Sequence, residues 1–216
     1  MVLEIGAGEG IITAELGRRA GYVVAHEIDP ALARRLRERF GPESSVLVVE
    51  GDAFRQPLPR VPFRVVSNVP FESTTRLLRF LLDDPARPLE RAALVVQWEV
   101  ARKRTQRRPS TLLGLSWAPW WKLSLVRRLP ATAFRPAPSV DAGVLVVEPR
   151  ADPLLPQPEA RRFRALLRTG FAQGVRGFVS GQELRRLGLP RRPAARDLDV
   201  EEWVALYRFL RERGRA

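Results

Sequence analysis

The fold is decided by the first ten residues, Met1-Val2-Leu3-Glu4-Ile5-Gly6-Ala7-Gly8-Glu9-Gly10, together with the segment that follows them. Residues 1–5 are mostly apolar and predict a short strand, and residues 11–19 carry apolar side chains at helical spacing. A strand, a glycine-rich loop and a helix in succession form a common cradle for nucleotides. We therefore expect an α/β fold with a nucleotide-like ligand at this loop.

The spacing of the glycines narrows the class of ligand. The dinucleotide fingerprint requires a glycine at position 11, where this chain has Ile11, and Glu4 precedes the loop. An acidic residue there disfavours a pyrophosphate and favours a ligand with a positive end, such as the amino group of S-adenosylmethionine. A nicotinamide oxidoreductase is disfavoured because no hydride-handling residues follow. A glycine turn that holds no ligand stays open as the alternative.

Three more predicted strands end in polar residues. The segments are Tyr22–His26 before Glu27-Ile28-Asp29-Pro30, Val46–Glu50 before Gly51-Asp52, and Phe63–Ser67 before Asn68-Val69-Pro70-Phe71. The carboxyl ends of parallel strands meet at one edge of a sheet, and ligands bind in the crevice outside that edge. We therefore expect these polar residues to line one crevice with the glycine loop.

The acidic residues that follow the second and third predicted strands have different expected roles. Glu27 lies close to the spacing of the acid that grips ribose hydroxyls, whereas Asp29 before Pro30 has the pattern of a helix N-cap. Asp52 can accept a hydrogen bond from an adenine amino group or can form an Asx-turn, and the sequence favours neither.

The segment Asn68-Val69-Pro70-Phe71 suits an adenine held by its amino group. The Asn68 amide and nearby carbonyls can accept hydrogen bonds from an exocyclic amine, and the Phe71 ring can stack on a base. Pro70 fixes φ and removes one donor, which makes the loop stiff. By itself the segment is better explained as an ordinary strand-to-helix turn that carries one core aromatic residue, and the other motifs of the chain reverse this preference.

Composition limits the class of protein. The chain has 216 residues, 45% of them hydrophobic, and a net charge of +13 carried almost entirely by arginine, which suits nucleic-acid binding. It has no cysteine and a single histidine, His26, so we expect neither disulfides nor a metal site. No apolar run approaches membrane-spanning length, so we expect no membrane partner and a cytoplasmic location.

The second half of the chain is more basic and changes composition near Arg150. A helix predicted over 98–108 carries a run of cationic residues that either forms a solvated face or contacts RNA phosphates: Arg102, Lys103, Arg104, Arg107 and Arg108. After a proline-rich linker, helices are predicted over 159–171, 181–187 and 200–213, the last with a capping box of Asp199 and Glu202. We expect a ligand-binding domain over 1–150 and a small helical domain over 151–216, which binds RNA or merely closes the core.

Taken in order, these motifs resemble the S-adenosylmethionine-dependent rRNA adenine N6-methyltransferases. Within them the chain is most similar to the erythromycin-resistance branch, in particular its arginine-rich actinobacterial members. The resemblance covers essentially the whole chain, and its specific parts are Glu4–Gly10, Glu27-Ile28-Asp29, Gly51-Asp52, Asn68–Phe71, Gln97–Arg104 and Phe134–Val140.

The resemblance implies a Rossmann-like methyltransferase sheet with a small C-terminal all-helical domain and S-adenosylmethionine as cofactor. It implies cofactor contacts in three groups: Glu4, Gly6, Ala7 and Gly8 toward the methionine part, Glu27 and Ile28 at the ribose, and Asp52 and Ala53 at the adenine. It makes Asn68, Pro70 and Phe71 the catalytic residues, with Asn68 also against the cofactor.

The activity implied is N6-methylation of an adenine in 23S rRNA by a monomer, giving resistance to macrolide, lincosamide and streptogramin B antibiotics. Two alternatives remain: a 16S rRNA adenine dimethyltransferase, whose family favours leucine and tyrosine where this chain has Val69 and Phe71, and a non-catalytic RNA-binding protein of the same fold. The family also has a segment before the first strand that closes over cofactor and base, and we expect this segment to be missing here.

Overall fold

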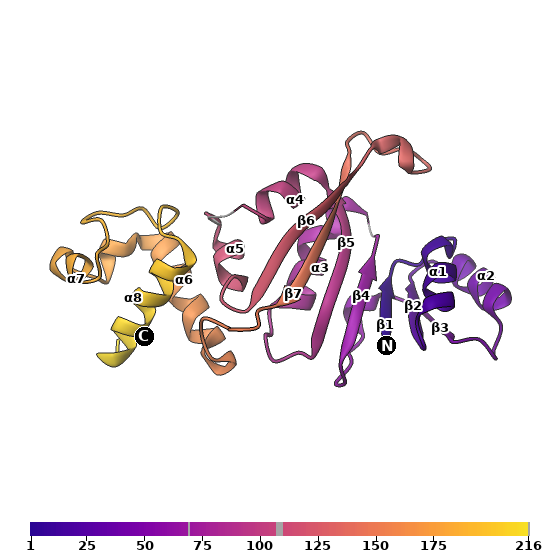
Figure 1. Cartoon of the computed structure of the whole chain (residues 1–216), viewed down its shortest axis with the longest axis horizontal. Helices are drawn as coiled ribbons and strands as arrows, with labels where there is room; N and C mark the ends of the chain where they lie inside the picture. Colours follow the sequence, from indigo (N-terminus) through magenta and orange to yellow (C-terminus); the bar gives the residue numbers. More distant parts are fainter. Residues whose placement is uncertain (69, 107–109, 216) are drawn as a thin grey trace. The chain divides into compact units, whose positions relative to one another are not determined.

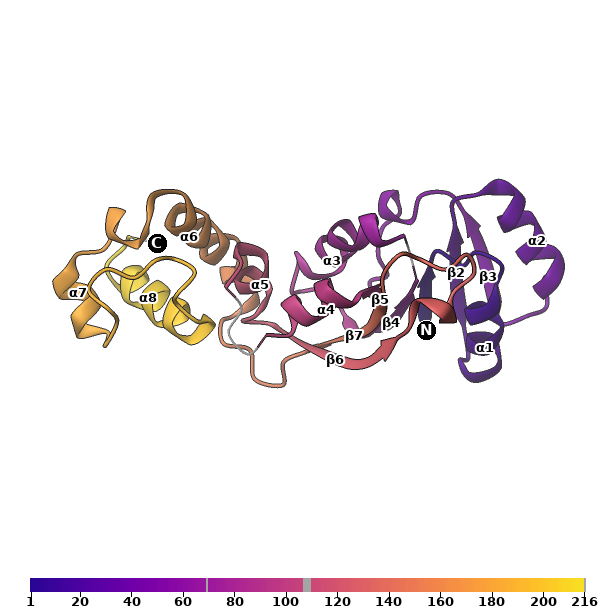
Figure 2. The same ribbon diagram turned by 90° about the horizontal axis from the view of Figure 1, so that it is seen from above.

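Seven strands form one sheet in the order β3-β2-β1-β4-β5-β7-β6, seen in Figure 1 and from above in Figure 2. The computed structural model describes residues 1–68, 70–106 and 110–215. The strands are β1 Val2–Ile5, β2 Val23–Glu27, β3 Val46–Glu50, β4 Phe63–Ser67, β5 Leu89–Gln97, β6 Trp121–Leu129 and β7 Ala142–Pro149. The first five pair in parallel, and β7 pairs with β5 in the antiparallel sense.

Helices connect the strands and make up most of the C-terminal part. They are α1 Ile11–Arg19, α2 Pro30–Phe40, α3 Thr74–Leu82, α4 Trp98–Arg104, α5 Leu112–Trp117, α6 Ala160–Gln173, α7 Gly181–Arg186 and α8 Val200–Glu212. No helix in the described part of the chain is both long and apolar enough to cross a membrane.

The register of the parallel strands brings their carboxyl ends together. Ile5 of β1 pairs with His26 of β2 on one side and with Ser67 of β4 on the other. The Ser67 hydroxyl donates to the Ile5 carbonyl at 2.9 Å, which ties the ends of β1 and β4. The residues that follow β1, β2, β3 and β4 therefore emerge at one edge of the sheet.

The chain divides into two compact units. The first comprises residues 1–81, 87–102 and 123–148, and the second comprises 82–86, 103–122 and 149–216. The expected helical domain over 151–216 is thus the largest part of the second unit. That unit also takes in two segments which the sequence had placed in the first domain.

The second unit has its own aromatic core. Phe163 of α6 packs edge to face against Trp120 and Tyr207, with ring centroids 6.0 Å and 5.6 Å away. All three rings are buried, as are Trp117 and Trp121, so these tryptophans are core residues. Gly170 of α6 lies against the ring of Trp203, where a Cβ atom would collide with the indole. Burial of these large rings is the main source of stability in this unit.

Most elements lie where the sequence predicted them, including the capping box of Asp199 and Glu202 at α8. Two differ. The basic helix predicted over 98–108 ends at Arg104, and Arg107 and Arg108 lie outside the described residues. A short helix, α5, was not predicted, although Thr111 caps it by accepting a hydrogen bond from the Gly114 amide at 3.2 Å. The cap signal, Thr111 before a run of apolar residues, was present in the sequence.

Candidate active site

A pocket of about 430 Å³ opens at the carboxyl edge of β1, β2, β3 and β4. Eight of the residues singled out in the sequence line it together: Gly6, Gly8, Glu27, Ile28, Asp52, Ala53, Asn68 and Pro70. Glu4, Ala7 and Phe71 are not among the lining residues. His26, Phe54, Ser73 and Arg76 also line the pocket. The volume lies within the ordinary range of small-molecule sites.

The glycine loop is held in shape by backbone hydrogen bonds and by one carboxylate. The amides of Gly6 and Ala7 both donate to the His26 carbonyl at 3.0 Å. Gly8 and Gly10 have φ values of 56° and 77°, a region that residues with a side chain rarely adopt. At Gly10 a Cβ atom would also lie 2.5 Å from Leu36 Cδ2. The glycines thus let the loop lie close to α2.

Glu27 joins β2 to the glycine loop. Its Oε2 accepts from the Gly8 amide at 2.7 Å, and its Oε1 accepts from the Asp29 amide at 2.9 Å. The side chain is buried, and each carboxylate oxygen can still accept one more hydrogen bond. Asp29 instead caps α2 by accepting from the amides of Ala31 and Leu32, which confirms its predicted structural role.

The structure shows one of the two roles that the sequence left open for Asp52. Its Oδ1 accepts from the Phe54 amide at 2.9 Å, so it does form the predicted Asx-turn. Its Oδ2 accepts from Arg76 Nη2 at 2.8 Å, and the carboxylate lines the pocket. Desolvation raises the pKa of Asp52, but the Phe54 amide and the Arg76 guanidinium outweigh it and hold the pKa below its ordinary value. The group is therefore an ionised, oriented acceptor at neutral pH.

Glu4 is buried in β1 without a hydrogen-bond partner for either carboxylate oxygen among the described residues. Desolvation raises the pKa of Glu4 to about 7. The Thr13 hydroxyl opposes this rise in pKa, although its geometry falls short of a hydrogen bond. The negative charge of Glu27 raises the pKa of Glu4 further. An uncompensated buried carboxylate beside the glycine loop is costly unless a positive group approaches it.

The raised pKa of Glu4 predicts a pH dependence of folding stability. Because the folded protein binds this proton more tightly than the unfolded chain, stability should fall as pH rises from about 4.5 to about 7, by about 3 kcal/mol at most. Glu4→Gln should remove this loss. Urea unfolding at pH 5 and pH 7.5 measures it, with Glu9→Gln, an exposed acid of the same loop, as control. An equal pH dependence in wild type and Glu4→Gln would contradict the assignment.

Asn68 and Pro70 line the pocket, and Phe71 follows them in the chain without lining it. Asn68 and Pro70 are exposed, and Phe71 is half-buried at the start of a 3₁₀ turn that leads into α3. Val69, between them, lies outside the described residues. Asn68 thus lines the same pocket as Glu27 and Asp52, and it is exposed to solvent.

The cations of α4 have unlike environments. Arg102 and Lys103 are exposed, and Arg102 bonds Glu99 of its own helix at 2.9 Å. Arg104 is half-buried, donates to the Thr111 hydroxyl at 3.2 Å, and has its guanidinium 5.8 Å from the Trp117 ring. Desolvation lowers the pKa of Arg104. Among the described cations of this run, Arg102 and Lys103 are therefore the accessible ones.

Comparison with known proteins decides the family. Residues 1–180 match the model described as "Ribosomal RNA adenine dimethylase". The chain belongs to this family. It is 42% identical, over 99% of its length and 71% of the relative's, to the mycinamicin-resistance protein MyrB of Micromonospora griseorubida. It is 36% identical to a ribosomal RNA small subunit methyltransferase A of Synechococcus, over 98% of the chain and 81% of the relative.

A solved structure shows the same fold. The crystal structure of the 23S rRNA methyltransferase ErmE has a TM-score of 0.79 and 30% identity, and the match covers 97% of this chain and 90% of that one. The Rossmann-like methyltransferase fold and the resemblance to the erythromycin-resistance branch are therefore confirmed. As a member of the dimethylase family, the chain is an rRNA adenine methyltransferase by class.

Sequence reasoning missed Arg76 in this member of the dimethylase family. Besides bonding Asp52, its guanidinium lies 4.2 Å from the centroid of the Phe54 ring, which in turn packs edge to face against Phe80. A signal was available, because Arg76 lies in the first turn of the helix that follows the Asn68 motif. The first turn of a helix after a parallel strand lies at the same edge of the sheet as the pocket.

Proposed function

We propose that this protein transfers a methyl group from S-adenosylmethionine to the N6 amine of an adenine in 23S rRNA and thereby confers resistance to macrolide, lincosamide and streptogramin B antibiotics. The observation that carries the proposal is the shared pocket, in which Asn68 and Pro70 line one cavity with the glycine loop, Glu27 and Asp52. The cavity suits a nucleoside. It is also lined by the exposed Asn68, whose side-chain amide would hold the target amine.

The residues present fit the cofactor. Glu27 would accept from the ribose hydroxyls, with the exposed Ile28 against the nucleoside, and Asp52 would accept from the adenine amine beside Ala53. The loop Gly6-Ala7-Gly8 would face the methionine part. The unpaired, buried carboxylate of Glu4 supports a ligand that brings an ammonium group toward this loop. When bound, the cofactor supplies an electrophilic methyl group on a sulfonium.

The chain's own residues would activate the target amine. An exocyclic adenine nitrogen is a poor nucleophile because its lone pair is delocalised into the ring. The Asn68 side-chain oxygen and a backbone carbonyl near Pro70 would accept its hydrogens, which increases electron density on nitrogen and fixes its direction of attack. Phe71 would stack on the everted base, whose removal from a stack costs a few kcal/mol. No general base is required, since the methylated ammonium loses its proton readily to water.

Arg76 should hold Asp52 in position for the cofactor adenine. Arg76→Met removes both the ion pair and the contact with Phe54, so the carboxylate can rotate, and we expect the affinity for S-adenosylhomocysteine to fall about tenfold. Calorimetry measures it. Arg55→Met is the matched control, because the Arg55 guanidinium lies 3.8 Å from the same Asp52 oxygen but is 85% exposed. Equal affinities in the two variants would count against this role.

The substrate proposal has one competitor. The relative from Synechococcus is a small subunit methyltransferase, whereas MyrB, by its name a mycinamicin-resistance protein, and the 23S rRNA methyltransferase ErmE support the large subunit. Primer extension on rRNA from cells with and without the gene separates the two. A stop at one 23S adenine supports the proposal, and a stop only in 16S rRNA replaces it. Calorimetry with S-adenosylmethionine excludes a purely RNA-binding protein if the cofactor binds.

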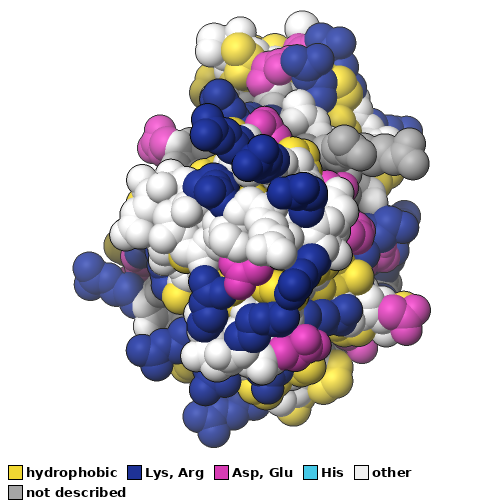
Figure 3. All heavy atoms as spheres, turned by 90° about the vertical axis from the view of Figure 1, so that its left-hand side faces the viewer, with side chains coloured by type: hydrophobic (Ala, Val, Ile, Leu, Met, Phe, Trp, Pro, Cys, Tyr) yellow, Lys and Arg dark blue, Asp and Glu magenta, His cyan; other side chains and the backbone are white. Residues whose placement is uncertain are grey.

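We further propose that Arg102 and Lys103, with Arg104, Arg107 and Arg108, contact RNA phosphates, and that the helical domain over 151–216 binds RNA. Arginines outnumber acidic residues over 150–216, and Figure 3 shows Lys and Arg side chains spread over the face that this part presents. Such an excess favours binding to the phosphate backbone. We also propose that the protein acts as a monomer in the cytoplasm.

A further inference from the structure

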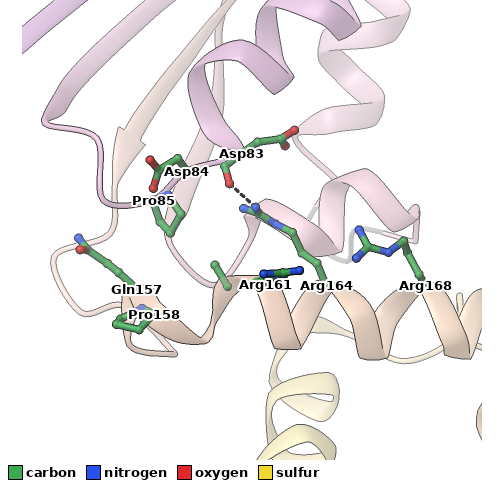
Figure 4. Close-up of a pocket in the computed structure, with 9 residues that line it drawn as sticks. Asp83, Asp84, Pro85, Gln157, Pro158, Arg161, Arg164 and Arg168 are labelled. Atoms are coloured by element: carbon green, nitrogen blue, oxygen red, sulfur yellow. Dashed lines mark hydrogen bonds between the residues drawn. The ribbon is translucent and has the colours of Figure 1, made fainter. Parts of the chain in front are cut away.

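The second unit contains a cavity of about 330 Å³ that is separate from the cofactor pocket (Figure 4). One wall is the face of α6 that carries Arg161, Arg164 and Arg168, and the other is the segment Asp83-Asp84-Pro85. Gln157 and Pro158 close one end. All of these residues belong to the second unit, so the cavity lies within one compact body.

Arg164 is a fixed part of the cavity wall. Its guanidinium donates to the backbone carbonyls of Ser116, Asp83 and Leu82 and lies 5.6 Å from the Trp120 ring. In Figure 4 the dashed line runs from Arg164 to the Asp83 carbonyl. Because its donors are engaged by carbonyl groups, Arg164 keeps its positive charge in the wall without forming an ion pair there.

The two flanking arginines are different. Arg161 and Arg168 are exposed, and neither has an ion-pair or hydrogen-bond partner within the described residues. Their positions, i−3 and i+4 from Arg164, place them on the same helix face. Desolvation lowers the pKa of Arg164. The nearby charges of Asp83 and Asp84 oppose this decrease, and the charge of Arg168 adds to it. Three guanidinium groups are thus gathered at one cavity, where an anion would relieve their repulsion.

The acids of the cavity do not cancel this charge. The Asp83 carboxylate accepts from the indole nitrogen of Trp117 at 2.8 Å, and the Asp84 carboxylate accepts from the Ala86 amide at 3.0 Å. The Asp83 carboxylate is thus held by α5 and the Asp84 carboxylate by its own turn, and the two acids offset only part of the charge of the three arginines. The cavity keeps an excess of positive charge, and its volume exceeds that of a bare phosphate and admits a sugar-phosphate unit.

We propose that this cavity binds one backbone phosphate, with its attached sugar, of the rRNA substrate through Arg161 and Arg168. The inference rests on the proposed function, because rRNA is the polyanion which that function brings to the protein. A guanidinium pairs bidentately with phosphate oxygens, so two of them can hold one phosphate in a fixed orientation. The site would position RNA outside the methylation pocket and would be indifferent to base identity.

The test compares neighbouring arginines on α6. Binding of an in vitro transcript of 23S rRNA is measured by filter retention at several salt concentrations, in the presence of S-adenosylhomocysteine. Arg161→Ala and Arg168→Ala should each weaken binding about tenfold at 100 mM salt and lower the salt slope by about one. Arg162→Ala is the matched control, because Arg162 is also exposed, lies on the same helix and does not line the cavity. Its effect should stay within twofold.

Two results would overturn the site. Equal losses at 161, 162 and 168 would mean a diffuse attraction rather than a site, and no loss at 161 and 168 would mean that RNA does not reach the cavity. Arg161→Lys and Arg168→Lys should recover part of the affinity, because they keep the charge but lose the bidentate geometry. Thermal unfolding checks that the variants fold. Because the readout is RNA binding, a wild-type protein that binds RNA but methylates none would refute the proposed function and leave this inference standing.

Discussion

Asn68→Ala should lower methyl transfer about a thousandfold and leave the affinity for S-adenosylhomocysteine within a few-fold of wild type. Asn68 lines the pocket and is exposed to solvent, whereas the groups that would hold the nucleoside, Glu27 and Asp52, are less exposed. Removal of one oriented polar group that acts on developing charge typically costs a factor of 10²–10³ in rate. Single-turnover transfer of labelled methyl to 23S rRNA gives the rate, and calorimetry gives the affinity.

Ser73→Ala is the control for this substitution, because Ser73 lines the same pocket and also loses a polar group. Its rate should stay near that of wild type. Asn68→Gln keeps the amide but moves its oxygen by one carbon–carbon bond, so it should restore little activity. Transfer by Asn68→Ala at the wild-type rate would exclude Asn68 from the reaction and would remove the main support for the proposed mechanism.

Glu27→Ala should weaken S-adenosylhomocysteine binding by about a hundredfold or more. Two ribose hydroxyls would lose a charged acceptor, and hydrogen bonds to charged groups are each worth about 1.5–3 kcal/mol. The substitution also releases the Gly8 amide, which Glu27 holds at 2.7 Å, so the glycine loop loses its anchor. Calorimetry measures the affinity, and circular dichroism checks the fold.

Asp29→Ala tests whether cofactor binding belongs to Glu27 alone while Asp29 serves only as the cap of α2. Asp29 lies two residues from Glu27 and caps α2, so its loss should cost about 1 kcal/mol of stability with little change in cofactor affinity. If Asp29→Ala weakens cofactor binding as much as Glu27→Ala does, the two acids share one role and the assignment made from their spacing is wrong. Urea unfolding and calorimetry on the same samples give both quantities.

Local chemistry explains why much of this site could be predicted. A few consecutive residues are enough to recognise glycines that need positive φ, a proline after an N-cap aspartate, and a strand followed by Asn68. In a parallel sheet the carboxyl ends of the strands meet at one edge, whatever the length of the chain that connects the strands. That is why eight of the predicted residues line one pocket.

Other features depend on contacts between distant segments. The pairing of Arg76 with Asp52 depends on where α3 begins in space. The lack of a hydrogen-bond partner for the Glu4 carboxylate among the described residues depends on what packs around β1. The division into units is of the same kind, because segments 82–86 and 103–122 join the C-terminal helices through Trp120 and Phe163. Spacing along the chain does not encode such contacts.

The sequence by itself determined the α/β order of elements, the family, and which strand ends would carry the chemistry, because each of these follows from short-range patterns. Only the tertiary structure decided that Glu4 is buried without a partner, that Arg76 fixes Asp52, and that Arg161, Arg164 and Arg168 border a cavity with Asp83 and Asp84. Burial, ion pairing and cavities arise from the packing of segments far apart in the chain, and that packing sets the pKa and the reach of each side chain.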